Sequence, residues 1–163
     1  MDKSVDVLLH ALDEAFDRKA WHGTNLRGSI RGLAARDAAW RPGRGRHNIW
    51  EIVVHAAYWK YAVRRRLLGE KRGTFPLKGS NWFDRPVVGA DNDAQWASDV
   101  ASLIATHASL RQAVAGLTSS DLWKPAAGGT TSVLSLVAGI AAHDVYHAGQ
   151  IQLLKRLGPA RVS

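Results

Sequence analysis

The chain has 163 residues, of which 46% are hydrophobic, a formal net charge of +8 and no cysteine. This length fits one domain with a sizeable core, and the lack of cysteine excludes disulfides and thiolate metal ligands. No apolar run reaches the roughly 18 residues of a membrane-spanning helix, and the charged residues 1–6 show no signal-peptide pattern, so we expect a single cytoplasmic domain over residues 1–163.

Apolar residues recur every three or four positions along much of the chain, whereas the alternating pattern of strands is scarce. A first helix is predicted over residues 4–19, and a shorter one near residues 25–33. The residues expected to face inward are Val5, Leu8, Leu12, Ala15 and Phe16 in the first, and Leu26, Ile30 and Leu33 in the second.

The second long helix is predicted to begin at Asn48, after a turn at residues 41–46 that contains Gly and Pro. Asparagine is a favourable N-cap, and the side chain of Glu51, three residues later, can reach back to the amide of the cap residue. The helix is expected to end near Gly69. Its inward-facing residues are expected to be Ile52, His55, Trp59 and Ala62.

A long loop is predicted over residues 69–90, where Gly and Pro recur. A loop of this length within a compact domain is often functional. The third long helix is predicted to begin near residues 91–93, whose aspartates suit a helix N-terminus. Its inward-facing residues are expected to be Trp96, Val100, Leu103, His107, Leu110, Val114 and Leu117.

The fourth long helix is predicted to begin near residues 130–132 and to end at Gly158, which the helix breaker Pro159 follows. Its inward-facing residues are expected to be Leu136, Ile140, His143, His147, Gln150, Leu154 and Leu157. The last two helices alternate steps of three and four residues, which is the pattern of a helix bundle. We therefore predict an all-α four-helix bundle with a long loop between the second and third long helices.

Three histidines on the predicted inward faces indicate a metal site. His143 and His147 are four residues apart, so in a helix they share one face and lie about 6 Å apart along the axis. Imidazoles buried side by side need a shared partner, which a metal ion supplies. With His55 they would form a three-histidine set with an open coordination position, as in catalytic rather than structural sites.

For several neighbouring side chains the sequence leaves more than one role open. His107 is a further ligand, a partner of a ligand or a core residue, and we favour the last two. Asp144 turns about 100° away from the preceding histidine, which places it behind the ligands or on the surface; it and His107 are the candidates for a general base. His47 is a candidate for the mouth of the site. We expect Trp59 to pack near the metal and Tyr146 to face away from it.

The excess of positive charge lies between residues 41 and 85, which contain 11 Lys and Arg and 3 Asp and Glu, whereas residues 1–40 and 86–163 each sum to zero. Such a region can bind nucleic acid, an anionic small molecule or an anionic membrane, or it is simply a solvated face. We expect the arginines at 64–66 and the long loop to shape access for an anionic ligand.

Several stretches together carry a family likeness. They are Trp21-His22-Gly23, Ala39-Trp40-Arg41-Pro42, His47-Asn48-Ile49-Trp50-Glu51, His55-Ala56-Ala57-Tyr58-Trp59, and His143-Asp144 followed by His147 and Gly149-Gln150-Ile151. With these stretches the chain resembles the DinB/YfiT-like superfamily over nearly its whole length. The combination of His55, His143 and His147 is the most specific part of this resemblance.

The resemblance implies a four-helix bundle, often dimeric, in which His55, His143 and His147 hold a divalent metal ion, commonly nickel or zinc. Members of known chemistry include thiol transferases that use low-molecular-weight thiols such as bacillithiol, and a mycothiol-dependent maleylpyruvate isomerase. Other members are described as metal-dependent hydrolases. For this chain, the resemblance implies a homodimer that binds a divalent metal and a low-molecular-weight thiol.

We therefore expect a divalent-metal-dependent enzyme, a thiol S-transferase or a hydrolase, that acts on a small molecule. An anionic thiol suits the basic region, because such thiols carry carboxylates. The alternative is a non-catalytic, metal-containing binding module that uses residues 41–85 to bind nucleic acid or another anionic partner. A metal that only stabilises the fold is less favoured, since a chain of this size folds without one.

Overall fold

The computed structural model describes residues 2–85 and 92–158. Within these ranges the chain is helical, and its only β-type pairing is an isolated bridge between Pro125 and Ser132. The described helices are α1 (Lys3–Phe16), α2 (Leu26–Ile30), α3 (Ala35–Ala39), α4 (Ile49–Leu68), α5 (Asp93–Ala115), α6 (Ser119–Leu122) and α7 (Val133–Leu157). The prediction of an all-α chain is confirmed. None of these helices is both long enough and apolar enough to cross a membrane.

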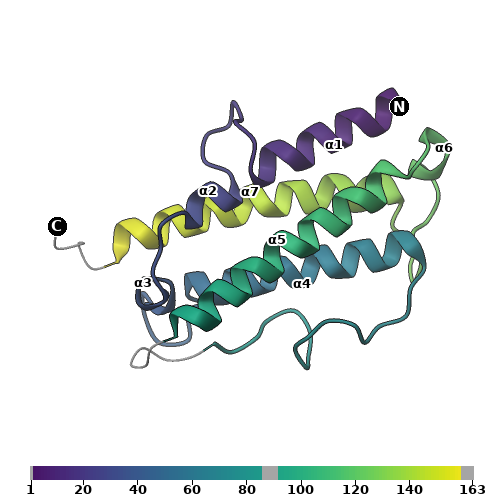
Figure 1. Ribbon diagram of the computed structural model, residues 1–163. Coiled ribbons are helices and arrows are strands. Elements are labelled where there is room, and N and C mark those ends of the chain that lie inside the picture. The colour runs from purple at the N-terminus through teal and green to yellow at the C-terminus, as the bar shows by residue number, and fades with distance from the viewer. Residues whose placement is uncertain (1, 86–91, 159–163) are drawn as a thin grey trace.

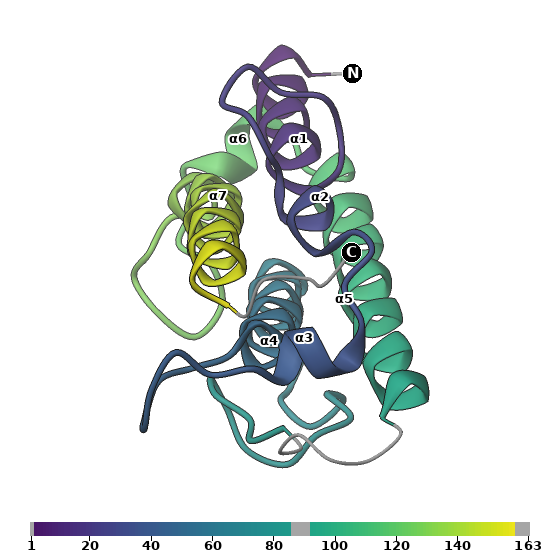
Figure 2. The ribbon, with the colours of Figure 1, turned by 90° about the vertical axis from the view of Figure 1, so that its left-hand side faces the viewer.

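The long helices α1, α4, α5 and α7 lie side by side and run along the length of the molecule (Figure 1). Figure 2 views α4 and α7 nearly end-on and α5 at a slant, with α5 and α7 on opposite sides, α1 above and α4 below. The short helix α2 packs on α7, and α3 packs on α4. The described part of the connection from α4 to α5 runs back along the outside of α4 (Figure 1).

The start and the end of α4 follow the sequence signals. The side chain of Asn48 accepts a hydrogen bond from the amide of Glu51 at 2.8 Å, and the Glu51 carboxylate accepts one from the Asn48 amide at 3.4 Å. This is the predicted capping box. The Asn48 side chain also donates to the carbonyl of Ala39 at 3.2 Å, which ties the start of α4 to α3. Gly69 caps the other end in the left-handed conformation, with φ of 67°.

Other predicted boundaries differ or lie outside the described residues. α1 ends at Phe16 rather than at residue 19, because the amides of residues 17 and 18 both bind the carbonyl of Asp13 and close the last turn. The helix α5 begins at Asp93. The possible start at residue 91, the end of the long loop at residues 86–90 and Pro159 lie outside the described residues.

The predicted inward faces of α1, α2 and α5 are largely confirmed. The residues predicted for these faces are buried or partly buried in the core. Only Val100 and Leu117 are partly rather than fully buried. Leu33 and Leu117 lie just beyond the ends of α2 and α5. His107 is among the buried residues of α5.

The predicted inward face of α4 is only partly correct. α4 is buried on most of its circumference, because α3, α5, α7 and the segment after Gly69 surround it. Trp59, predicted to face inward, is 38% exposed, whereas the neighbouring Lys60 is fully buried. A lysine at this position looks like a surface residue in the sequence, and only the packing of neighbouring helices shows that it is not.

The buried stripe of α7 lies about one position further along the chain than predicted. Its centre is formed by Val137, Asp144 and Ile151, which have no exposed surface. The stripe is broad because α7 packs against both α1 and α4. His143 therefore lies at the edge of the stripe and is only partly buried, and Leu157, predicted to face inward, is 58% exposed.

Candidate metal centre

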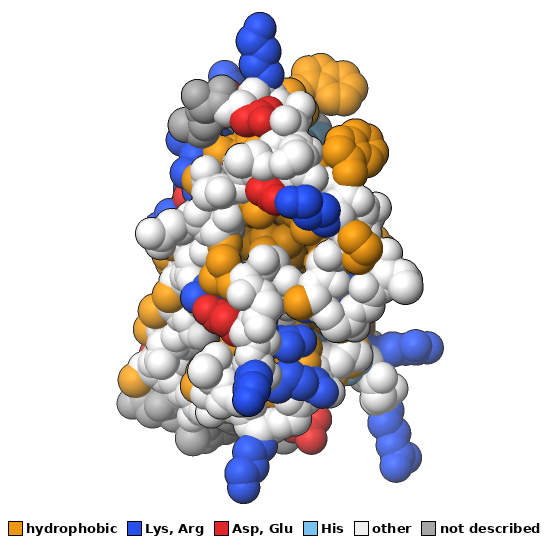
Figure 3. All heavy atoms as spheres, turned by 90° about the vertical axis from the view of Figure 1, so that its right-hand side faces the viewer, with side chains coloured by type: hydrophobic (Ala, Val, Ile, Leu, Met, Phe, Trp, Pro, Cys, Tyr) orange, Lys and Arg blue, Asp and Glu red, His pale blue; other side chains and the backbone are white. Residues whose placement is uncertain are grey.

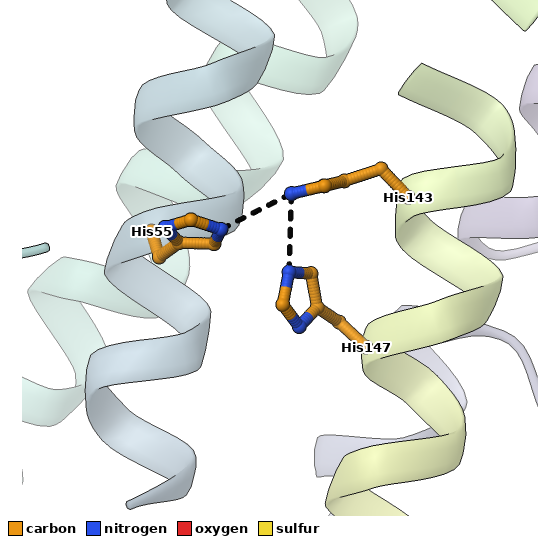
Figure 4. A group of neighbouring side chains, drawn as sticks. All are labelled: His55, His143 and His147. Atoms are coloured by element: carbon orange, nitrogen blue, oxygen red, sulfur yellow. Dashed lines mark hydrogen bonds between the residues drawn. The ribbon is translucent and has the colours of Figure 1, made fainter. Parts of the chain in front are cut away.

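Three histidines from two helices meet in the interior, where α4 faces α7. Figure 4 shows His55 of α4 opposite His143 and His147, which stand one turn apart on α7. The Nε2 atom of His143 lies 3.1 Å from Nε2 of His55 and 3.0 Å from Nε2 of His147. In the described part of the chain, these residues are the group whose ligand atoms, all within 4.8 Å of one another, could hold a metal ion.

The other nitrogen of two of these rings has a hydrogen-bond acceptor. Nδ1–H of His55 donates to the backbone carbonyl of Asn81 at 2.8 Å, and Nδ1–H of His147 donates to Oε1 of Gln150 at 2.7 Å. The amide of Gln150 is oriented by its own donation to the Tyr146 hydroxyl at 3.1 Å. These contacts assign the proton of His55 and of His147 to Nδ1, so each Nε2 presents a lone pair to the centre of the group.

The backbone at Asn81 is bent to reach His55. Asn81 has φ of 68°, and among the described non-glycine residues it alone has a positive φ. The amide of Trp82 binds the carbonyl of Ser80 at 2.9 Å, so Asn81 is the central residue of a γ-turn, a rare and strained conformation. Asparagine tolerates positive φ better than most residues. Its side-chain oxygen also accepts a hydrogen bond from Nε1 of Trp59 at 2.9 Å, which holds the turn on α4.

The next residue, Trp82, contacts two histidine rings. Its ring is stacked on His55, with centroids 3.9 Å apart, and on His47, with centroids 3.6 Å apart. Nδ1 of His47 lies 3.0 Å from a carboxylate oxygen of Glu51, which Arg41 also binds. Burial would raise the pKa of Glu51, but the hydrogen bonds from Arg41 and His47 hold it below its usual value. His47 thus lies close to the three-histidine group, with the ring of Trp82 in contact with both His47 and His55.

Burial keeps the three imidazoles neutral. It lowers the pKa of His55 to about 4 and the pKa of His143 to about 3, and the neighbouring imidazoles act in the same direction. Burial also lowers the pKa of His147, although the hydrogen bond to Gln150 partly opposes this shift. Neutral imidazole is the form that binds a metal, so near neutral pH no proton has to be displaced.

The three rings do not satisfy one another by hydrogen bonding. His55 and His147 both present lone pairs, and neutral His143 has a single N–H. If that proton is on Nδ1, it is buried without a partner; if it is on Nε2, it is shared between two acceptors. A divalent ion accepts all three lone pairs at once. Tetrahedral nitrogen ligands of zinc lie about 3.3 Å apart, close to the observed 3.0 and 3.1 Å. The residues therefore fit a metal ion with an open coordination position.

His107 and Asp144, the candidates for a general base, have other contacts in the structure. The ring of His107 is stacked on Phe16 at 3.7 Å and is not part of the three-histidine group. Asp144 is fully buried and binds Lys60, so the surface alternative is wrong.

The aromatic residues near the group differ in part from what the sequence predicts. Trp59 contacts His55 edge-on, with centroids 6.3 Å apart, as its predicted place near the site requires. Tyr146, expected to face away, is 64% exposed but contacts the ring of His147 at 5.2 Å and binds Gln150. Tyr146 and Gln150 thus support His147, a role that their spacing of one and three residues from that histidine allows within a helix.

The arginines at 64–66 already have partners within the chain. Arg64 binds the carboxylate of Glu70 at 2.6 and 2.9 Å, and Arg65 donates to the carbonyl of the same residue at 3.1 Å. Arg66 donates to the carbonyl of Ala127 at 3.0 Å. On the face in Figure 3, Lys and Arg side chains stand singly or in small groups between hydrophobic, polar and acidic ones. The loop, by contrast, does reach the site through Asn81 and Trp82.

Comparison with known families gives a match over most of the chain. A family model described as the DinB superfamily matches residues 6–151, a range that includes His55, His143 and His147. No curated protein and no solved structure matches the chain. The superfamily is one whose members bind metals, in agreement with the geometry of the three-histidine group.

We expect acidification to destabilise the metal-free protein. The unfolded chain takes up protons on its histidines near about pH 6.5, whereas the lowered pKa values of about 4 for His55 and about 3 for His143 keep the folded state neutral there. Between these values the unfolded state binds more protons. The free energy of unfolding should therefore fall as the pH falls, by up to about 1.4 kcal/mol per pH unit for each such histidine.

Urea unfolding of the metal-free protein from about pH 7 down to about pH 5 measures this dependence. A His143→Gln variant lacks one of the titrating groups and should show a shallower dependence. A free energy of unfolding that stays constant over this interval would contradict the burial of neutral imidazoles.

We expect the turn at Asn81 to control metal affinity. In an Asn81→Val variant, a β-branched residue must adopt the left-handed conformation, at a cost of about 1–2 kcal/mol, and the carbonyl that holds His55 should move. Asn81→Gly keeps the conformation accessible but loses the bond from Trp59, and Trp59→Phe removes that bond alone. In zinc titrations, the affinity of Asn81→Val should be well below those of Asn81→Gly and Trp59→Phe. Equal affinities for all three variants would show that the turn does not position His55.

Proposed function

The chain belongs to the DinB superfamily, and from this premise we propose that it is an enzyme that uses one divalent metal ion held by His55, His143 and His147. The observation that carries this proposal is the convergence of the three Nε2 atoms: that of His143 lies 3.1 Å from that of His55 and 3.0 Å from that of His147. Such an ion, when bound, lowers the pKa of a water or a thiol and so supplies a nucleophile near neutral pH. Nickel and zinc are the proposed ions, since the family resemblance implies them and imidazole suits both.

Of the two reactions, we favour thiol transfer over hydrolysis. The contacts of the three imidazoles described above are with a backbone carbonyl, a side-chain amide and aromatic rings, and none is with a carboxylate. No side chain in these contacts is therefore placed to take a proton from water. A thiol ionises at about pH 8.5 even without a metal, whereas water, with a pKa of about 15.7 in bulk, depends wholly on the ion to reach this range. The thiol therefore depends less on such a base.

We propose that the thiol is small and anionic. The basic stretch 41–85 supports this, although part of its charge is neutralised by Glu51, Glu70 and the buried Asp144. Arg44 and Arg46 are exposed and lie three residues and one residue before His47, whose ring is stacked on Trp82 beside His55. We therefore assign the contact with the thiol carboxylates to these two arginines in place of those at 64–66.

The proposal also covers the helix arrangement and the quaternary structure, for which the family resemblance implies a four-helix bundle and a dimer. We propose that α1, α4, α5 and α7 are the four-helix bundle of the superfamily, with its long loop between α4 and α5, and that the protein is a homodimer. In support of a dimer, the exposed side of α7 includes Val145, Tyr146, Leu153 and Leu157. No Lys, Arg or Glu, and no Asp except the buried Asp144, lies between residues 133 and 154.

The alternative, a metal-containing module that binds nucleic acid, rests on the charge of residues 41–85 alone. Phosphate binding needs cations that are free to meet the backbone. In the described residues Arg41, Arg64 and Arg85 bind carboxylates of the same chain. This engagement of the arginines is the reason that we rank the enzyme first.

We expect protein purified without a polyhistidine tag to contain close to one divalent ion per chain and to conjugate a bacterial low-molecular-weight thiol to an electrophile. A chelator should abolish turnover, and nickel, zinc and manganese should restore it to different extents. His143→Ala should lose both the metal and the activity. The matched control is His107→Gln, which replaces a buried histidine outside the group and should keep both.

Two further variants separate the thiol site from charge in general. Arg44→Gln with Arg46→Gln should raise KM for an anionic thiol and reduce its dependence on salt, whereas Gln at 64, 65 and 66 should change KM little. A metal-loaded protein that is inert with every thiol tested but hydrolyses an ester or amide would reverse the ranking of the two reactions. Tight, salt-dependent binding of duplex DNA that these arginine changes abolish would favour the binding module instead.

A further inference from the structure

The most deeply buried ion pair of the described residues joins the two helices that carry the histidines. Nζ of Lys60, on α4, donates a hydrogen bond to Oδ2 of Asp144, on α7, and neither side chain has any exposed surface. Asp144 directly follows His143, and Lys60 lies five residues after His55. The pair therefore connects α4 and α7 beside the candidate metal centre, and no step of the proposed reaction uses it.

Stability alone is a poor explanation for such a contact. Removing two charges from water costs several kcal/mol per ion, and an apolar pair of similar size is often as stable or more stable. What an ion pair adds is direction, because the hydrogen bond forms only when the two side chains meet at one place. Buried polar pairs are known to fix the register of neighbouring helices in this way.

Five alanines lie among the buried residues of α4 and α7: Ala56, Ala57 and Ala62 on the first helix and Ala141 and Ala148 on the second. Where side chains are this small, a helix can slide or rotate past its neighbour with little loss of contact, since small, similar residues specify position poorly. A directional contact between the two helices adds a preference for one alignment.

Lys60 also lies where all four long helices meet. Its Nζ atom is 4.9 Å from the centroid of the Phe16 ring of α1, and Phe16 is stacked on His107 of α5 at 3.7 Å. Lys60 thus contacts α1 as well as α7, and α5 packs against the α1 residue that it contacts. Any shift of α4 along its axis would disturb these contacts together.

The required accuracy is high. A slip of one residue moves a helical side chain about 1.5 Å along the axis and turns it by about 100°, enough to remove Nε2 of His55 from its position 3.1 Å from Nε2 of His143. We infer that Lys60 and Asp144 are positioning residues, whose hydrogen bond sets the register of α4 against α7 and so places His55 opposite His143 and His147. This inference rests on the proposed metal site and adds the device that aligns it.

The test compares metal affinity with the stability of the metal-free fold. In the Lys60→Met/Asp144→Val variant, apolar residues replace the pair. Its melting temperature without metal should equal or exceed that of the wild type. Its affinity for cobalt(II) or zinc should fall at least tenfold, since loss of the groups that orient metal ligands typically costs 10–100-fold. The visible bands of bound cobalt(II) should change as well, because they report the ligand geometry.

Two matched variants identify the cause. Lys60→Gln/Asp144→Asn keeps a directional hydrogen bond without charge and should bind cobalt(II) within a few-fold of the wild type. Asp13→Leu/Arg111→Met removes the ion pair that joins α1 to α5, with N–O distances of 2.6 and 3.0 Å. Because neither of those helices carries a ligand, this variant should leave the affinity unchanged.

The possible outcomes separate this inference from the proposed function. A wild-type protein that binds neither cobalt nor zinc would refute the metal site itself. A wild type that binds, with a Met/Val variant that binds equally well, would overturn the register role and leave the site standing. If the Met/Val variant does not fold, the Gln/Asn variant decides: affinity near that of the wild type supports the inference, and a large loss overturns it.

Discussion

Imidazole lone pairs that face one another at close range repel unless a cation lies between them. Nε2 of His143 lies 3.1 Å from that of His55 and 3.0 Å from that of His147, and the bonds to Asn81 and Gln150 leave lone pairs on the outer two. Burial disfavours the alternative of protonation, as the lowered pKa values of these histidines indicate. The rest of the structure around them serves to hold this arrangement, which is unfavourable without a cation.

The segment after α4 contributes to this arrangement although it is not helical. Aromatic residues attach it to α4, because Phe75 and Phe83 pack against Tyr58, and the Tyr61 hydroxyl accepts hydrogen bonds from the amides of residues 73 and 74 at 3.2 and 3.3 Å. This course brings the strained turn at Asn81 to His55. Strain of this kind persists only where surrounding contacts hold it, and it is commonly found at functional sites. Unlike the two ligands on α7, His55 therefore depends on a contact with a distant part of the chain.

The features that could be predicted from the sequence depend on local spacing. The capping box of Asn48 and Glu51 and the pairing of His143 with His147 each involve residues within one turn of a helix, so their sequence positions determine them. The buried Lys60–Asp144 pair could not be predicted, because both residue types are usually exposed and only the packing of α4 against α7 buries them. The turn at Asn81 could not be predicted either, since a loop has no periodicity. The buried stripe of α7 was displaced from its predicted position because this helix packs against two neighbours.

X-ray absorption spectroscopy of the zinc- or nickel-loaded protein tests the central claim most directly, since it counts the imidazoles around the ion. The geometry of His55, His143 and His147 predicts three imidazole nitrogens at about 2.0–2.1 Å, with any remaining ligand a light atom from solvent or added thiol sulfur. In a His55→Ala variant the imidazole count should fall to two. A wild-type spectrum that shows one imidazole or none would contradict the account. A spectrum that does not change in the His55→Ala variant would contradict it as well.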